Sequence, residues 1–221
     1  MPPILEPSSE LKARVLASIK TRPSPTRNEA RWSVPLVVLG SAAFLASLYL
    51  ALGGREHGAG RSPATFTASM SVWIAAALLA LWAGVKRGRA PEGRPRLVLL
   101  AVAFGLPLAV MAVMLALSAS TAGDGAQVVL RPSSSCLALT LAAAIPGVLC
   151  LLFARRGSDA VHPTANGAAL GAAFGTYAGV MVCLWCPDVT PLHIALGHVA
   201  PVVLLALLGA ALGRHWLDLR R

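Results

Sequence analysis

Six apolar runs of about 20 residues each determine what this chain can fold into, because a helix of that length spans the roughly 30 Å hydrocarbon core of a bilayer. None of the 28 Lys, Arg, Asp and Glu residues of the chain lies inside a run. The runs cover residues 32–53, 64–85, 97–118, 134–153, 164–185 and 192–212. The sequence therefore predicts an all-α polytopic membrane protein with six transmembrane helices.

The basic residues are distributed unevenly between the segments that connect these runs. Sixteen of the 19 Lys and Arg residues lie in segments 1–31, 86–96, 154–163 and 213–221, and three lie in the other connections. Cytoplasmic segments of membrane proteins carry an excess of Lys and Arg. Both termini are therefore predicted to be cytoplasmic, and the same rule explains the net charge of +10 without a nucleic-acid partner.

This division gives a cytoplasmic tail over 1–31, a transmembrane bundle over 32–212 and a second cytoplasmic tail over 213–221. An ion-coupled transporter usually keeps an ionisable group inside the membrane. A membrane enzyme needs a nucleophile with its base, paired carboxylates or a metal cluster. The runs hold no acid or base other than histidine. We therefore expect neither an enzyme nor a transporter, and we expect no cofactor.

The fifth run carries a repeat of glycines at every fourth position, namely Gly167, Gly171, Gly175 and Gly179. Steps of four keep these residues near one face of a helix, and their missing side chains allow another backbone to approach closely. The repeat predicts tight helix packing. A partner helix in the same chain is favoured, but a helix of a second copy is also open.

Cysteines and histidines gather near the end of the fifth run. Cys183, Cys186, His193 and His198 are spaced C-x2-C-x6-H-x4-H. The two histidines would lie about 140° apart around an α-helix, which is a poor arrangement for structural zinc, so no metal site is predicted. Cys136 should lie at a similar depth to Cys186, and a disulfide between them remains open because their separation is unknown.

The tail contains one segment suited to binding another molecule, at residues 8–20. A helix is expected there, started by Pro7 and the serines after it and stopped at Arg22-Pro23. Its apolar stripe and flanking residues are Leu11, Lys12, Arg14, Val15, Leu16 and Ile19. A lone helix of this length is marginal in water. It should therefore become ordered against either the bilayer surface or a groove on a protein.

Several short motifs resemble the NrsF-like membrane anti-sigma factors. These are the Leu-Lys-Ala-Arg-Val-Leu segment of the tail, Arg155-Arg156-Gly157, the Gly/Ala-rich fifth run and the Cys186-Pro187-Asp188 turn. The resemblance implies a six-helix inner-membrane protein whose tail sequesters a CarQ-like extracytoplasmic-function (ECF) sigma factor. It also implies no direct contact with nucleic acid, and it leaves the oligomeric state open.

Within that family the length and opening of the chain are similar to the light-responsive regulators of carotenoid synthesis. This similarity implies that light, acting through singlet oxygen, removes the repression of carotenoid genes. The candidate sensor consists of oxidisable residues, namely Cys136, Cys183, Trp185, Cys186 and His193. The alternatives are a redox-responsive membrane protein without a sigma partner and a small transporter or helper subunit.

Overall fold

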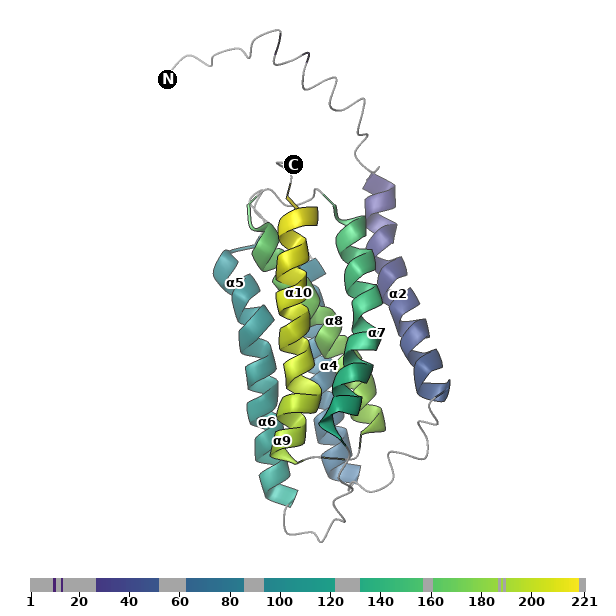
Figure 1. Ribbon diagram of the computed structural model, residues 1–221, viewed down its shortest axis with the longest axis vertical. Helices are drawn as coiled ribbons and strands as arrows, with labels where there is room; N and C mark the ends of the chain where they lie inside the picture. Colours follow the sequence, from purple (N-terminus) through teal and green to yellow (C-terminus); the bar gives the residue numbers. More distant parts are fainter. Residues whose placement is uncertain are drawn as a thin grey trace.

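The computed structural model describes residues 10, 13, 27–51, 63–85, 94–121, 132–156, 161–186, 188 and 190–218. Within these ranges the chain is helical and contains no strand, which confirms the all-α prediction. The elements are α2 (Arg27–Ala51), α4 (Pro63–Val85), α5 (Arg96–Leu100), η1 (Ala101–Gly105), α6 (Leu106–Thr121), α7 (Ser133–Ala154), α8 (Pro163–Trp185), α9 (Pro191–His193), η2 (Ile194–Val199) and α10 (Ala200–Trp216). Helices therefore lie at all six apolar runs (Figure 1).

Five of the described helical segments are long and apolar enough to cross a membrane. They are Pro63–Gly84, Arg96–Ala119, Ser133–Ala154, Pro163–Trp185 and Pro191–Trp216. Helix α2 differs because Arg27, Glu29 and Arg31 occupy its first turns, so its apolar part is the shorter segment Pro35–Ala51. The structure thus supports a membrane protein with five candidate spans and one shorter apolar helix.

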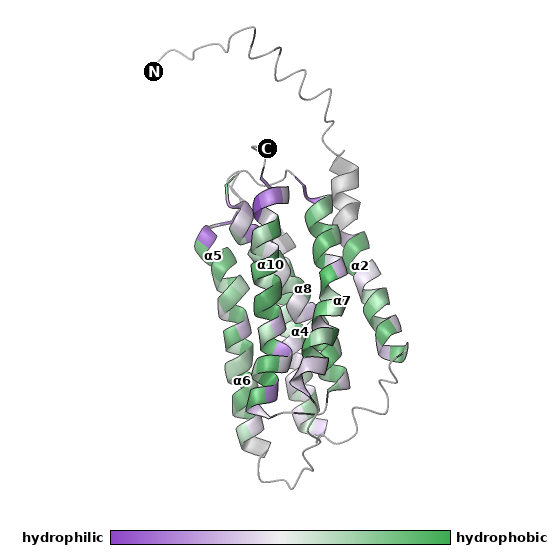
Figure 2. Ribbon diagram, in the orientation of Figure 1, coloured by the Kyte–Doolittle hydropathy of each residue, from purple (hydrophilic) through white to green (hydrophobic). Residues whose placement is uncertain are grey.

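Helix α8 lies at the centre of the bundle and packs against α10, α4 and α7 (Figure 1). In an apolar 18-residue stretch of α8, 78% of the residues are buried inside the protein, compared with 28% in the corresponding stretch of the span formed by α5, η1 and α6. The outward faces of the surrounding helices carry exposed leucines such as Leu78, Leu108 and Leu204. This arrangement suits a lipid environment, because small residues fill the centre while large apolar ones face outward. Figure 2 shows that α6, α7 and α10 are coloured mostly hydrophobic along their length.

The glycine repeat of α8 lies against two helices of the same chain. A methyl group at Gly167 would overlap the carbonyl oxygen of Gly209 in α10, and one at Gly171 would overlap that of Leu205. At Gly179 the obstacle is instead the indole ring of Trp73 in α4. Glycine lets the α8 and α10 backbones approach to a distance that no side chain permits.

Two of the helical rods contain a π-helical segment. Segment η1 ends at Gly105 and η2 ends at Val199, each two residues before a proline, Pro107 and Pro201 respectively. Proline lacks an N–H donor and its ring displaces the carbonyl of the preceding turn. A wider π turn just before the proline accommodates that displacement.

The two ends of the bundle differ in chemistry. Helix α2 begins and α10 ends at the same end (Figure 1). Every Lys and Arg of the described ranges lies there: Arg27, Arg31, Arg94, Arg96, Arg155, Arg156 and Arg214. At this basic end, Arg155 donates a 2.8 Å hydrogen bond to the carbonyl oxygen of Gly84, near the end of α4. The opposite end carries α9 and three of the four cysteines, Cys136, Cys183 and Cys186, and we call it the cysteine end.

Candidate functional site

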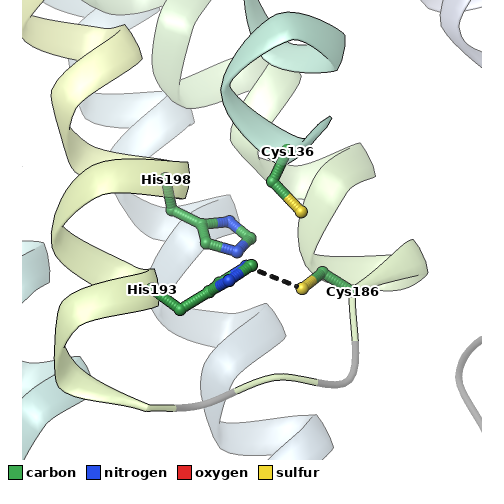
Figure 3. A group of neighbouring side chains, drawn as sticks. All are labelled: Cys136, Cys186, His193 and His198. Atoms are coloured by element: carbon green, nitrogen blue, oxygen red, sulfur yellow. Dashed lines mark hydrogen bonds between the residues drawn. The ribbon is translucent and has the colours of Figure 1, made fainter. Parts of the chain in front are cut away.

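Four metal-ligating side chains meet at the cysteine end of the bundle (Figure 3). Cys136 comes from the first turn of α7, Cys186 follows the last residue of α8, His193 ends α9 and His198 lies in η2. One ligand atom from each residue lies within 4.8 Å of those of the other three. All four residues are buried, with exposed fractions of 0%, 0%, 2% and 6% in that order.

The local structure explains why the two histidines share a face. Five residues separate them, and a π-helix repeats its hydrogen bonds at the same spacing, from residue i to i+5. Segment η2 therefore places His198 about one turn beyond His193, and their ring centroids are 5.2 Å apart. The 140° separation expected from the sequence applies to an α-helix and is wrong for this segment.

Hydrogen bonds hold the His193 ring from both sides. Its Nε2 atom lies 3.1 Å from the Cys186 sulfur. Its Nδ1 atom lies 3.3 Å from a carboxylate oxygen of Asp188 and 3.4 Å from the hydroxyl of Ser133. Asp188 is itself fixed, because its other carboxylate oxygen accepts a 2.8 Å hydrogen bond from the Thr190 N–H group. These contacts fix the orientation of the ring, with its Nε2 atom facing the centre of the cluster.

The surroundings of Cys186 favour a thiolate. Its pKa is lowered to about 3, first by a hydrogen bond with Cys136 and then by His198 and His193, whereas burial acts in the opposite direction. The thiolate is the form of cysteine that attacks oxidants and binds metal ions. All four cysteines of the chain are free, including Cys136 and Cys186.

The structure brings together only part of the sensor predicted from the sequence. Cys136, Cys186 and His193 converge, and Trp185 packs beside the two cysteines in a small apolar cluster. Cys183 lies elsewhere, in the main core of the bundle. His198 was not among the sensor residues predicted from the sequence. The π-helical segment before Pro201 places it beside the other three residues of the cluster.

The predicted partner-binding residues of the tail lie outside the described residues. Only Glu10 and Ala13 of segment 8–20 are described, and both are helical and exposed. The helix that continues from the tail, α2, lies at the edge of the bundle and packs mainly against α7 (Figure 1). Helix α7 also carries Cys136, so one helix contacts both the cysteine cluster and the helix joined to the tail.

Comparison with known proteins places the chain in a family. Residues 17–218 match the sequence model of NrsF, described as negative regulator of sigma F. Because the match covers most of the chain, the chain belongs to this family, as its motifs indicated. No curated protein and no solved structure matches the chain. The family consists of negative regulators of a sigma factor and is not an enzyme family, so the chain is an anti-sigma regulator.

Proposed function

We propose that this protein anchors an ECF sigma factor at the bacterial inner membrane and thereby keeps it from RNA polymerase. The observation that carries the proposal is the NrsF family match over residues 17–218, which includes every helix among the described residues that is able to cross a membrane. A regulator built mostly of such helices can act on a sigma factor only through segments outside the bilayer.

The proposal assigns six spans and cytoplasmic termini to the chain. The basic residues of the described ranges support this orientation, because they all lie at the end where α2 begins and α10 ends. Helix α2 would be the sixth span. Its apolar part is 17 residues long, slightly short of the usual requirement, and a bilayer accommodates such a mismatch by local thinning. Labelling of single cysteines placed at the two ends of the bundle measures the orientation.

The tail is the proposed sigma-binding element. Helix α2 begins inside this tail, at Arg27. Residues 8–20 of the tail combine a Leu/Val/Ile stripe with basic flanks. A helix of this kind binds by laying its apolar face into a hydrophobic groove. The family match begins at residue 17, so most of this segment precedes the matched region. The proposal for the tail therefore rests on its own pattern.

Direct binding tests this proposal. The full-length protein in lipid nanodiscs is expected to bind the sigma factor encoded beside its gene, and residues 1–31 fused to a soluble carrier should retain much of that binding. The double variant Leu11→Asp/Val15→Asp should lose binding. Ala13→Asp/Ala17→Asp is the matched control, since it adds the same charge on the opposite helix face. If neither the full-length protein nor the fusion binds the sigma factor, the proposed function is wrong.

The proposed signal is light acting through singlet oxygen, with carotenoid genes as the regulated output. The resemblance to light-responsive regulators supports this assignment, as does the oxidisable chemistry of Cys136, Cys186, His193 and Trp185 at the cysteine end. Cells carrying Cys136→Ser or Cys186→Ser should respond differently to light. Cys150→Ser is the control, because Cys150 is exposed and lies in a different part of α7. An unaltered response in both test variants would remove the cysteines from the signalling role.

A further inference from the structure

We propose that Cys136, Cys186, His193 and His198 bind one Zn²⁺ ion at the cysteine end of the bundle. Two thiolates and two imidazoles are a standard ligand set for structural zinc. In this chain they come from four separate elements and meet in one buried cluster (Figure 3).

The distances between the ligand atoms are close to those of a zinc centre. Bond lengths of about 2.3 Å to sulfur and 2.0–2.1 Å to nitrogen imply ligand separations of roughly 3.3–3.8 Å around a tetrahedron. The four atoms already lie within 4.8 Å of one another, and the Cys186 sulfur is 3.1 Å from His193 Nε2. Small rotations of the side chains complete the tetrahedron.

The groups around the ligands orient them as a metal site requires. A histidine that binds a metal through one nitrogen usually offers its other nitrogen to a carboxylate. His193 has this arrangement, with Nε2 toward the cluster and Nδ1 at 3.3 Å from Asp188. Gly197 leaves room for the ring, because a methyl group there would lie 3.2 Å from His193 Nε2 and 3.3 Å from the Cβ atom of Cys136.

Burial of these groups is a second observation that points to a ligand. The Nδ1 atom of His198 is buried and has no hydrogen-bond partner among the described residues. A buried polar atom that makes no hydrogen bond lowers the stability of the folded protein, because it has lost its contact with water. A bond from this nitrogen to a metal ion would remove that cost.

The charge of the two thiolates and the soft character of the sulfur ligands favour Zn²⁺ over Mg²⁺ and Ca²⁺. Two thiolates neutralise a divalent cation, so the completed site carries no net charge inside an apolar bundle. Sulfur and imidazole ligands exclude Mg²⁺ and Ca²⁺, which prefer oxygen. Four protein ligands leave no open coordination position, so the site is structural rather than catalytic.

The ion would tie three separate parts of the bundle together. It joins the start of α7, the end of α8 and the π segment that leads into α10. Among the described residues, this is the one group of cysteine, histidine and acidic side chains that could hold a metal ion. Elsewhere the same elements are joined by helix packing.

Elemental analysis of the full-length protein tests the proposal. Protein purified in detergent under reducing conditions, then given Zn²⁺ and desalted, should hold one zinc per chain. Cys136→Ser and His198→Gln should each reduce this to near zero. Cys183→Ser and His162→Gln are the matched controls, because each removes the same kind of group outside the cluster, and both should retain one zinc.

A second measurement on the unaltered chain covers the case in which a variant fails to fold. X-ray absorption at the zinc edge should show two sulfur neighbours at about 2.3 Å and two nitrogen neighbours at about 2.0 Å. Unaltered protein that holds no zinc under these conditions overturns the proposal. So does an absorption spectrum without sulfur neighbours, or loss of zinc in the control variants to the same extent. Sigma-factor binding is not used in any of these measurements, so their outcome is independent of the proposed function.

Discussion

The contact between α8 and α10 makes a quantitative prediction for Gly171→Ala. The new Cβ atom would overlap the Leu205 carbonyl oxygen and lie 2.6 Å from its carbonyl carbon, compared with an optimum of about 3.5 Å between carbon atoms. Both obstacles are backbone atoms of α10, so no side-chain rotation removes the clash. The two helices must separate by about 1 Å, and a gap of that size forfeits a quarter to a half of each contact energy.

We expect Gly171→Ala to destabilise the bundle by about 2–3 kcal/mol, at the upper end of typical overpacking costs. Gly40→Ala is the matched control. A methyl group at Gly40 meets nothing within 4 Å, and alanine favours a helix over glycine by about 0.5–1 kcal/mol. Reversible unfolding in mixed detergent micelles measures both variants. Equal stability of the two variants would refute the account of α8 packing.

Three further predictions concern the two ends of the bundle. Arg155→Ala should destabilise the protein by about 1–2 kcal/mol in the same unfolding assay, because it removes a charge-assisted hydrogen bond to α4, whereas Arg156→Ala should have little effect. Asp188→Asn should weaken zinc binding about 10- to 100-fold in a competition titration with a chelator, and an unchanged affinity would mean that the carboxylate does not orient its histidine. Pro201→Ala should let η2 relax toward an α-helix and lower the zinc content, while unchanged zinc would show that the π segment does not depend on the proline.

Much of the fold could be predicted because the bilayer limits the options. A helix is the local structure that satisfies its own backbone in lipid, so an uncharged run of about 20 residues indicates a helix with few alternatives. Helix α2 was harder to interpret, because its helical residues extend back to Arg27 while its apolar part begins only at Pro35. The length of a helix and its ability to cross a membrane are separate properties. The length of the apolar run indicates only whether the helix can cross a membrane.

The glycine repeat predicted close packing but not the partner. Its main partner is α10, which contributes Gly209 and Gly213 at the closest approach. Two glycines four residues apart, one near the end of a run rich in leucine and alanine and one just after it, were a weak signal compared with the repeat in α8. Which helices pair depends on the packing of the whole bundle, and spacing along one helix does not contain that information.

The cysteine cluster shows where reasoning from spacing fails. Cys136 is 50 residues before Cys186 in the sequence, so no local motif contains both. The argument against a metal site assumed an α-helix between His193 and His198, and η2 changes that geometry. The available signal was Pro201, because a proline inside an apolar run displaces the turn before it.

Fractionation of cells tests the central claim most directly. The fraction of the neighbouring sigma factor that sediments with membranes is measured in cells that express either the unaltered chain or Leu11→Asp/Val15→Asp at equal membrane levels. We predict that the unaltered chain holds most of the sigma factor in the membrane fraction, and that the variant releases it and raises transcription from its promoters. Equal distribution of the sigma factor in the two strains, with unchanged transcription, would contradict the account.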